Sequence, residues 1–409
     1  MWKTVKLDEL CTIKGRIGYR GYTKADLVEK GNGAITLSPS NIISNKLSFN
    51  KNRYISWEKY YESPEIMLEI GDIVFCKTAS IGKLALVEKL PEKTTLNPQF
   101  VVLKNITCNA KFLHYYMQST FFNKQLSKII GGAAIPTVSQ KNLGNLIIFI
   151  PPLSEQERIV AKLDAAFAEI DEAIELTALK KEEINNFKCS ILDINNKNNN
   201  SFTCALHDFK KLKIGEICNL MTGGTPSRKV PEYFENGEIK WLVSGDINQK
   251  EIFDCDGRIT EEGLNNSNAK FLPENSVLMA LNGQGKTRGT VAMLKTKATC
   301  NQSLVSIFPK PGVNLNTKYL YYFLEGMYDK IRRITGDSGN DRRGLNMPLI
   351  RNIEILLPPI TEQENIILKL ETAINKLDIA NKAVNEVINN YKALKSAILS
   401  MELQSSEAA

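Results

Sequence analysis

Two short stretches, "PPLSEQERIV" at residues 151–160 and "PPITEQENII" at residues 358–367, decide the architecture of this 409-residue chain. They lie 207 positions apart, and other segments match at the same offset, such as "KFLHYYMQ" (111–118) with "KYLYYFLE" (318–325). Between these anchors the offset slips by a few residues. Fixed ends and a variable middle are typical of one scaffold that occurs twice with different loops.

After each Pro-Pro pair the hydrophobic spacing becomes that of an α-helix. A hydroxyl residue followed three positions later by glutamate predicts a capping box at each start, formed by Ser154 with Glu157 and by Thr361 with Glu364. Apolar residues then recur every three or four positions, and neither segment contains Pro or Gly. We therefore expect two helices of about 39 residues, each roughly 58 Å long at 1.5 Å per residue.

An apolar stripe on so long a helix must be covered, and the simplest cover is the other helix. The sequence predicts an antiparallel coiled coil, in which helix pairs bury such stripes against each other. Its expected core consists of Ile159, Leu163, Phe167, Ile170, Ile174, Ile366, Leu370, Ile374, Leu377 and Val384. The alternative is that each helix packs on its own domain, but a domain of about 150 residues is only about 30–40 Å across.

The residues before each long helix predict an α+β, or mixed α/β, domain. Short β-branched and aromatic runs come first, then a helix of about 20 residues from near Asn109 or Asn316, then a last strand. We expect a tandem repeat of two domains, each with a mixed sheet and flanking helices. The predicted segments are a first domain, a long helix, a flexible Asn-rich connector, a second domain, a second long helix and a tail, at 1–150, 151–194, 195–207, 208–357, 358–403 and 404–409.

The charge is unevenly distributed along the chain. The net charge is +7, but residues 1–150 carry +9 and residues 201–350 carry +4, whereas 151–200 carry −4 and 351–409 carry −2. Basic blocks attract polyanions, and acidic ones are better suited to protein partners. No apolar run approaches the ~20 residues of a membrane helix, and the charged start "MWKTVKLDEL" is unlike a signal peptide. We expect a cytoplasmic protein without a membrane partner.

The sequence predicts no catalytic, metal or cofactor site in this chain. Its eight cysteines include no CxxC pair, and there are only two histidines, so the clustered ligands of a zinc site are missing. Glu238-x-Lys240 resembles the core of some nucleases, but the pattern is short and has no counterpart in the first domain. A nuclease at Glu238 and Lys240 stays open as an alternative, as does a coiled-coil scaffold that binds no DNA.

Loops rich in Arg, Lys, Ser, Thr, Asn and Gly recur at similar places in both basic blocks. These residue types suit phosphates and the edges of bases, and glycine allows close approach of the backbone. The candidate DNA-binding residues of the first domain are Arg16, Tyr19, Arg20, Lys24, Ser38, Ser40, Asn41, Lys77, Thr78 and Ser80. Those of the second are Thr222, Gly223, Gly224, Thr225, Arg228, Lys229, Ser244, Asp246, Asn282, Gln284, Lys286, Arg288, Arg342, Arg343 and Asn346.

With these loops and the tandem layout, the chain resembles the specificity subunits of type I restriction–modification systems. The resemblance covers the whole chain and rests on the tandem layout, the two helix-opening phrases, and "GGTPSR", "RGTVAML" and "RRGLN" in the second unit. The first unit departs from the pattern, with "GRIGYR" in place of "GGTPSR".

The resemblance implies two target recognition domains, each recognising one half of a bipartite, asymmetric sequence in double-stranded DNA. It implies that the long helices space these domains and dock two copies of an adenine methyltransferase subunit, in a host-defence system. S-adenosylmethionine, Mg²⁺ and ATP would then belong to partner subunits. Whether a restriction subunit also takes part is left open.

Overall fold

The computed structural model describes residues 2–131, 135–194, 209–283, 286–335 and 345–404. It divides into two compact units, Met1–Thr177 with Glu386–Ala409, and Ala178–Asn385. We call these unit 1 and unit 2. The division cuts through both long helices, so each unit contains one domain with the first part of one helix and the last part of the other.

Unit 1 contains two four-stranded sheets, whose strand orders are β2-β11-β8-β9 and β10-β4-β7-β3. Only the pairing of β10 with β4 is parallel, so the second sheet is mixed, as the sequence predicts. A β1–β12 pair and a β5–β6 hairpin complete the set. The strands are β1 Lys3–Lys6, β2 Thr12–Gly15, β3 Leu27–Val28, β4 Gly33–Leu37, β5 Ile42–Ile43, β6 Lys46–Leu47, β7 Arg53–Ser56, β8 Ile73–Cys76, β9 Leu84–Leu86, β10 Thr94–Leu96, β11 Phe100–Lys104 and β12 Ile147–Ile150.

The helices of the unit 1 domain are short. They are α1 Leu7–Leu10, α2 Trp57–Tyr61, α3 Ala110–Tyr116, α4 Thr120–Ile129 and α5 Gln140–Gly144. The single helix predicted from near Asn109 is therefore wrong, because it is split into α3 and α4. Asn109 does cap α3, but Ser119 begins a new helix by accepting a hydrogen bond from the Phe122 amide at 3.2 Å.

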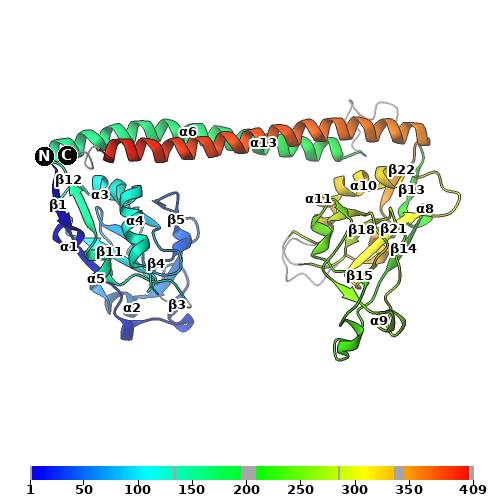
Figure 1. The fold of residues 1–409 in the computed structure, drawn as a ribbon, viewed down its shortest axis with the longest axis horizontal. Helices are drawn as coiled ribbons and strands as arrows, with labels where there is room; N and C mark the ends of the chain where they lie inside the picture. Colours follow the sequence, from blue (N-terminus) through cyan, green and yellow to red (C-terminus); the bar gives the residue numbers. More distant parts are fainter. Residues whose placement is uncertain (1, 132–134, 195–208, 284–285, 336–344, 405–409) are drawn as a thin grey trace. The chain divides into compact units, whose positions relative to one another are not determined.

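Strand β11 shows why its sequence "FVVL" is apolar throughout. Successive side chains of a strand point to opposite faces of the sheet. Phe100 and Val102 belong to a core between the two sheets, whereas Val101 and Leu103 belong to a core shared with α3, α4 and the long helices. Figure 1 shows α3 and α4 between this sheet and α6. Both faces of residues 100–103 are buried, so these four positions are apolar, and only Lys104, which ends the strand, is half-buried.

Unit 2 repeats this plan with a five-stranded sheet, β14-β21-β18-β19-β16, and a three-stranded sheet, β17-β15-β20. Each contains one parallel pair, β16 with β19 and β15 with β20. The strands are β13 Lys211–Lys213, β14 Cys218–Thr222, β15 Ile239–Leu242, β16 Glu251–Ile252, β17 Arg258–Ile259, β18 Val277–Ala280, β19 Val291–Leu294, β20 Thr299–Cys300, β21 Leu304–Pro309 and β22 Glu354–Leu356, the last paired with β13.

The helices of the unit 2 domain are α8 Ile214–Ile217, α9 Glu261–Asn265, α10 Thr317–Gly326, α11 Tyr328–Thr335 and α12 Met347–Arg351. The helix predicted from near Asn316 is again two helices, α10 and α11, separated at Met327. Strand β18 alternates as β11 does: Val277 and Met279 face the helices, and Leu278 faces the second sheet. The two domains are thus copies of one fold, as the 207-residue offset indicates.

The two long helices are α6, Leu153–Leu192, and α13, Ile360–Gln404. In unit 1 the Lys395 ammonium lies 2.7 Å from the Asp171 carboxylate. In unit 2 Lys181 Nζ donates to Asn385 Oδ1 at 2.8 Å, and Lys188 lies 2.7 Å from Asp378. As the number rises along one helix it falls along the other, so the predicted antiparallel pairing is confirmed. No helix in the described part of the chain is long and apolar enough to cross a membrane.

The apolar stripe of each long helix is not covered by the other helix alone. Ile159, Leu163 and Phe167 of α6 are buried in the same core as the unit 1 domain, together with Leu399 and Leu403 of α13. In unit 2, Ile366, Leu370 and Ile374 of α13 share a core with that domain and with the end of α6. The predicted coiled-coil core is therefore corrected: its first residues in each helix pack mainly on the domain. Further along, Ile170 is buried, whereas Ile174, Leu377 and Val384 are half-buried.

The predicted capping boxes are wrong. Helix α6 begins one residue before Ser154, and the Pro152 carbonyl accepts hydrogen bonds from the amides of Glu155 and Gln156 at 2.9 and 3.1 Å. Helix α13 begins in the same way, with Pro359 in the place of Pro152. The four predicted capping residues, Ser154, Glu157, Thr361 and Glu364, are all exposed. Proline at the N-cap position places each hydroxyl within the first turn, and the amide three residues further on, which it was predicted to cap, is already bonded within the helix.

A buried glutamine fixes each helix start instead. Gln156 donates to the Pro151 carbonyl at 2.8 Å and accepts from the Asn109 amide at 2.9 Å, which joins α6 to the start of α3. Gln363 donates to the carbonyls of Pro358 and Asn314 at 2.8 and 2.9 Å and accepts from the Asn316 amide at 2.8 Å. The glutamine in the repeated phrase therefore ties the end of the last strand, the long helix and the domain helix together.

His114 of α3 supplies a pH prediction. His114 is 8% exposed, and burial lowers the pKa of its imidazole from 6.5 to about 4. Between pH 6.5 and pH 4, His114 is therefore protonated in the unfolded chain but stays neutral in the folded chain. The free energy of unfolding consequently falls as the pH falls. The wild-type protein should lose up to about 3 kcal/mol of its free energy of unfolding over this pH range, and we expect His114→Gln to abolish this loss. Denaturant titrations of both proteins at pH 7, 5.5 and 4.5 measure it, and a difference that does not change with pH would contradict it.

Candidate nucleic-acid interface

In unit 1 the candidate loops meet where strands β4 and β8 end and β11 begins. The Asn97 amide donates to the Leu37 carbonyl at 3.0 Å, and the Lys77 amide donates to the Gln99 carbonyl at 2.8 Å. The Asn97 side chain accepts from the Gln99 amide at 3.0 Å, which fixes the turn into β11. The loops 38–41, 77–80 and 97–99 therefore form one edge of the domain.

Unit 2 builds the same edge with the same hydrogen bonds. The Asn301 amide donates to the Leu242 carbonyl at 2.9 Å, the Leu281 amide donates to the Ser303 carbonyl at 2.8 Å, and Asn301 Oδ1 accepts from the Ser303 amide at 2.9 Å. The loops 243–246 and 301–303, with residues 282–283 and 286–288, thus occupy the places of their counterparts in unit 1. The predicted equivalence of the loops is confirmed at the level of the backbone.

Exposed candidates occur in both units. Lys24 and Ser40 are exposed in unit 1, and Arg228, Lys229, Asn282, Lys286 and Asn346 are exposed in unit 2. The half-buried candidates are Ser38, Lys77, Thr78, Ser80, Thr222, Thr225, Ser244 and Asp246. Within the described residues, none of the five exposed or half-buried cations Lys24, Lys77, Arg228, Lys229 and Lys286 makes an ion pair with an acidic side chain. Their charge is available to phosphate groups.

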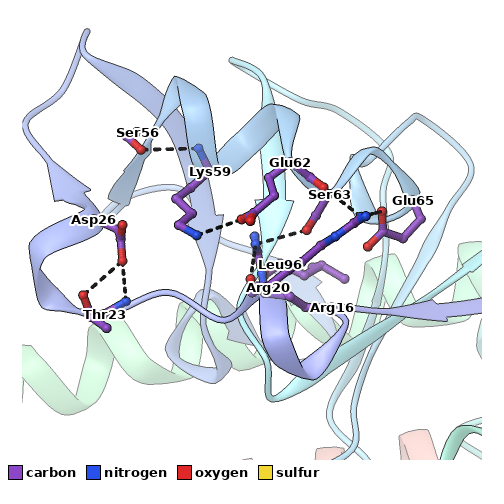
Figure 2. Close-up of polar contacts among 10 residues, drawn as sticks. All are labelled: Arg16, Arg20, Thr23, Asp26, Ser56, Lys59, Glu62, Ser63, Glu65 and Leu96. Carbon is purple, nitrogen blue, oxygen red and sulfur yellow. Dashed lines mark hydrogen bonds and ion pairs between the residues drawn. The ribbon is translucent and has the colours of Figure 1, made fainter.

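Arg16 is not a surface contact, which corrects the prediction. It is 6% exposed; its Nε donates to the Leu96 carbonyl at 3.3 Å, and its Nη1 donates to the Arg20 carbonyl and to Ser63 Oγ (Figure 2). Burial lowers the pKa of the Arg16 guanidinium. Arg20 is half-buried, donates to the Glu62 carbonyl at 2.9 Å and lies 3.7 Å from Glu65 (Figure 2). Both arginines hold the 16–23 loop against the segment 62–65.

Other candidates also serve the fold. Asn41 is buried and accepts from the Ser38 amide at 3.0 Å, and Asn346 caps α12. Arg288 is buried and donates to the Thr335 carbonyl at 2.9 Å. Asp246 accepts from the Val243 amide at 2.8 Å, which closes the turn after β15. Asn41, Arg288 and Asp246 shape loops that carry exposed candidates, whereas Asn346 is itself exposed and starts α12.

Glycines 223 and 224 are buried for a steric reason. A Cβ atom at Gly223 would lie 1.7 Å from the Cys300 carbonyl oxygen, and one at Gly224 would lie 2.7 Å from the Asn268 side chain. The Gly224 carbonyl also accepts a hydrogen bond from Trp241 Nε1 at 3.0 Å. These residues were predicted to contact DNA, but their packing requires glycine whatever the loop binds. Thr225, which follows, donates to Gln302 Oε1 at 2.6 Å.

Four of the candidate DNA-binding residues lie outside the part of the chain that the structure describes. They are Gln284, Arg342, Arg343 and, for its side chain, Tyr19. The connector 195–207 lies outside it as well.

A comparison with known protein families decides what this chain is. A model described as the type I restriction modification DNA specificity domain matches residues 1–186 and again residues 207–390. The chain belongs to this family. The two matches begin 206 residues apart, close to the offset of the internal repeat, so each specificity domain takes in one sheet domain and most of the long helix that follows it.

Individual relatives of the specificity family agree with this assignment. The EcoR124I/EcoR124II specificity subunit of Escherichia coli is 26% identical over 234 residues, which are 57% of this chain and 53% of that relative. The chain therefore spans about half the length of that curated relative. The MjaVIII specificity subunit of Methanocaldococcus jannaschii is 25% identical over 77% of this chain and 76% of that protein.

A solved structure of a type I restriction–modification system has the same fold. Its matching chain has a TM-score of 0.69 and 20% sequence identity, and the match covers 98% of this chain and 97% of that chain. The likeness extends over both domains and both long helices of the specificity fold.

The nuclease alternative gains no support from the geometry. Lys240 Nζ donates to the Phe253 carbonyl at 2.9 Å and to Thr296 Oγ1 at 2.8 Å, and it lies 3.6 Å from Asp254. Glu238 is exposed and shares none of these contacts. The described residues contain no group of three or more His, Cys, Asp or Glu side chains that would hold a metal ion. Lys240 therefore supports the second sheet of this specificity domain.

Proposed function

We propose that this chain is the DNA-binding specificity subunit of a type I restriction–modification complex. Residues 1–150 and 208–357 are its two target recognition domains, and each recognises one half of a bipartite, asymmetric sequence in double-stranded DNA. The observation that supports this most directly is the duplicated loop edge, in which the backbone hydrogen bonds are the same and the exposed side chains differ. Two copies of one scaffold with different side chains suit two different half-sites.

The exposed residues of the edges fit duplex DNA in their chemistry. Lys24, Lys77, Lys229 and Lys286 are suited to phosphates, which position a protein on the duplex but carry no sequence information. Arg228 and Asn282 are suited to bidentate contacts with guanine and adenine in the major groove. Hydroxyl side chains can contact both phosphates and base edges, and the candidates of this kind are Ser40, Thr78, Ser80, Thr222, Thr225 and Ser244. Arg342, Arg343 and Gln284 stay candidates from the sequence.

The long helices are the proposed docking surface for methyltransferase subunits. Phe187 of α6 is 54% exposed and Leu394 of α13 is 47% exposed, although both are large apolar side chains. They lie 207 residues apart, so they occupy the same position of the duplicated helices. Exposed apolar side chains on an acidic helix suit a protein partner better than phosphate. Because this position occurs twice, we propose that two methyltransferase copies bind.

Catalysis belongs to the partners in this proposal. The chain is non-catalytic alone and binds no cofactor, and S-adenosylmethionine, Mg²⁺ and ATP act on the methyltransferase and on any endonuclease subunit. The complex works in the cytoplasm, on host DNA and on incoming foreign DNA. The test is methylation sequencing of a host that expresses this chain with its methyltransferase subunit. One bipartite motif is expected, and methylation without a motif, or plasmid cutting by the purified chain with Mg²⁺, would overturn the proposal.

Arg228 carries the sharpest prediction for a single loop. It is exposed and makes no ion pair in the described residues, so Arg228→Ala leaves the fold intact. We expect it to relax recognition at one position of the half-site read by the second domain, by about 1–3 kcal/mol if it contacts a guanine. Lys229→Ala is the matched control, because loss of a phosphate contact weakens binding to all sequences alike and lowers the salt dependence. A changed preference in both half-sites would contradict the assignment.

A further inference from the structure

An acidic residue of α6 links the unit 1 domain to both long helices. Asp171 lies 3.2 Å from the ammonium group of Lys46, on the β5–β6 hairpin of the domain, and 2.7 Å from that of Lys395, on α13. Burial opposes the charge of Asp171, yet the two lysines together hold the pKa of its carboxyl below the ordinary value. Asp171 is thus a charged bridge between three segments far apart in the sequence.

Unit 2 contains the same bridge with the roles of the helices exchanged. Asp378 of α13 lies 2.7 Å from Lys188 of α6 and 3.4 Å from Lys250 of the domain. The aspartates lie 207 residues apart, as do Lys188 and Lys395, whereas the two domain lysines lie 204 apart. The same three residue types therefore meet in both copies. Lys46, Asp171 and Lys395 form the first triad, and Lys250, Asp378 and Lys188 form the second.

The loops that deliver the domain lysines differ. Lys46 follows the tight turn of the β5–β6 hairpin, whose residues Ser44 and Asn45 have φ angles of 49° and 58°. Lys250 lies directly before β16, and its carbonyl accepts a hydrogen bond from the Met293 amide at 2.9 Å. Two different loop structures thus bring a lysine to the same aspartate. Because two different loop structures make the same lysine–aspartate ion pair, the shape of one particular loop does not explain it.

The unit 1 triad spans a place where the domain and the helices do not pack closely. A groove of about 830 Å³ lies there, and its lining includes Lys46, His114, Asp171 and Lys395. The apolar contact of the domain with α6 runs through Ile159, Leu163 and Phe167, which all precede Asp171 in the helix. That core also takes in Leu399 and Leu403 of α13, but it does not include the β5–β6 hairpin that carries Lys46. The ion pair at the hairpin holds the domain at a second point, outside the apolar core.

We propose that Asp171 and Asp378 are positioning residues that fix the angle at which each recognition domain stands on the helix pair. They thereby restrict the range of half-site separations that the subunit accepts. This inference rests on the proposed function, because separation has a meaning only if both domains bind DNA together. Both carboxylates are partly exposed, so one ion pair changes such an equilibrium by about two- to fivefold. The triads therefore tune spacing and leave the sequence of each half-site unchanged.

The test uses the full chain in complex with its methyltransferase and a library of targets. The library joins the two half-sites by spacers of every length within a few base pairs of the preferred one, and the methylation rate on each is measured. We expect Asp171→Asn to raise the rate on neighbouring spacers, relative to the preferred one, by about two- to fivefold. Lys46→Gln, which cuts only the bond to the domain, should do the same. Asp378→Asn and Lys250→Gln are the equivalent pair in unit 2.

Glu169→Gln is the matched control. Glu169 lies on α6 two residues from Asp171, is exposed, and makes no ion pair among the described residues, so this change removes the same charge and leaves the triad intact. An unchanged spacer profile in Asp171→Asn and Lys46→Gln, or an equal broadening in Glu169→Gln, would overturn the inference. If the wild-type complex shows no bipartite target, the proposed function itself fails, and the two failures are thus distinct.

Discussion

Seven residues inserted into each long helix are expected to lengthen the preferred spacer between the half-sites by about three base pairs. Both helices are uninterrupted, and seven residues add about 10 Å at 1.5 Å per residue. Base pairs rise by about 3.4 Å. Seven residues are also close to two full turns, so the apolar stripe keeps its direction. Methylation on targets of graded spacer length measures the change, which should appear as a loss of the original target.

The register of the helix pair decides where the insertions belong. Lys181 bonds Asn385, and Asn185 lies 3.2 Å from Asn381, so the point after Glu182 in α6 lies opposite the point before Val384 in α13. Matched insertions at these points keep the pairing on both sides. Insertion into α6 alone shifts one helix past the other and should abolish methylation. If matched insertions change the half-site sequences, or leave the spacer unaltered, the helices do not set the spacing.

Replacement of Gln363 by alanine is expected to lower the free energy of unfolding by about 3–5 kcal/mol. The side chain is fully buried, and its removal leaves the carbonyls of Pro358 and Asn314 and the Asn316 amide without partners. Each buried polar group left unpaired costs about 1–3 kcal/mol, and losses above about 4–5 kcal/mol are rare for single changes. Denaturant titration of the full chain with Trp2 and Trp57 replaced by phenylalanine, so that Trp241 in unit 2 is the fluorescent reporter, measures the loss.

Two further variants show whether the hydrogen bonds of Gln363 are the cause. Gln363→Glu keeps the shape and one acceptor but loses the donors to Pro358 and Asn314, so it should also be strongly destabilising. Glu364→Ala changes the exposed neighbour that would belong to a capping box, and we expect an effect within about 0.5 kcal/mol. A large effect of Glu364→Ala together with a small effect of Gln363→Ala would contradict this role of Gln363 and would favour the capping box as the start of α13.

Much of the fold is predictable from the sequence because its signals are local or repeat along the chain. The offset between residues 151 and 358 reveals two copies of one unit, and the three- and four-residue spacing reveals the long helices. The split of the predicted domain helix at Ser119 is missed, although "MQSTFF" contains a serine in the position of an N-cap. Apolar spacing alone runs through such a break without a change.

The candidate site is predictable in its place but only partly in its side chains. The loops after β4, β8, β15 and β18 do form equivalent edges, and candidate cations such as Lys286 are exposed there. Arg16 and Arg288 have the same residue type and similar neighbours in the sequence, yet they are buried. Their partners, Leu96 and Thr335, lie 80 and 47 residues away.

By itself the sequence determined that the chain contains two copies of one fold, with basic loops suited to DNA and two long antiparallel helices. Repetition, hydrophobic periodicity and charge can all be seen in the sequence without knowledge of distant contacts. Only the tertiary structure decided which glutamine starts each helix, which arginines face solvent, and how Asp171 and Asp378 bind each domain to both helices. These depend on contacts between segments that are far apart in the sequence. Burial and partners, and not residue type, set the role of a polar side chain.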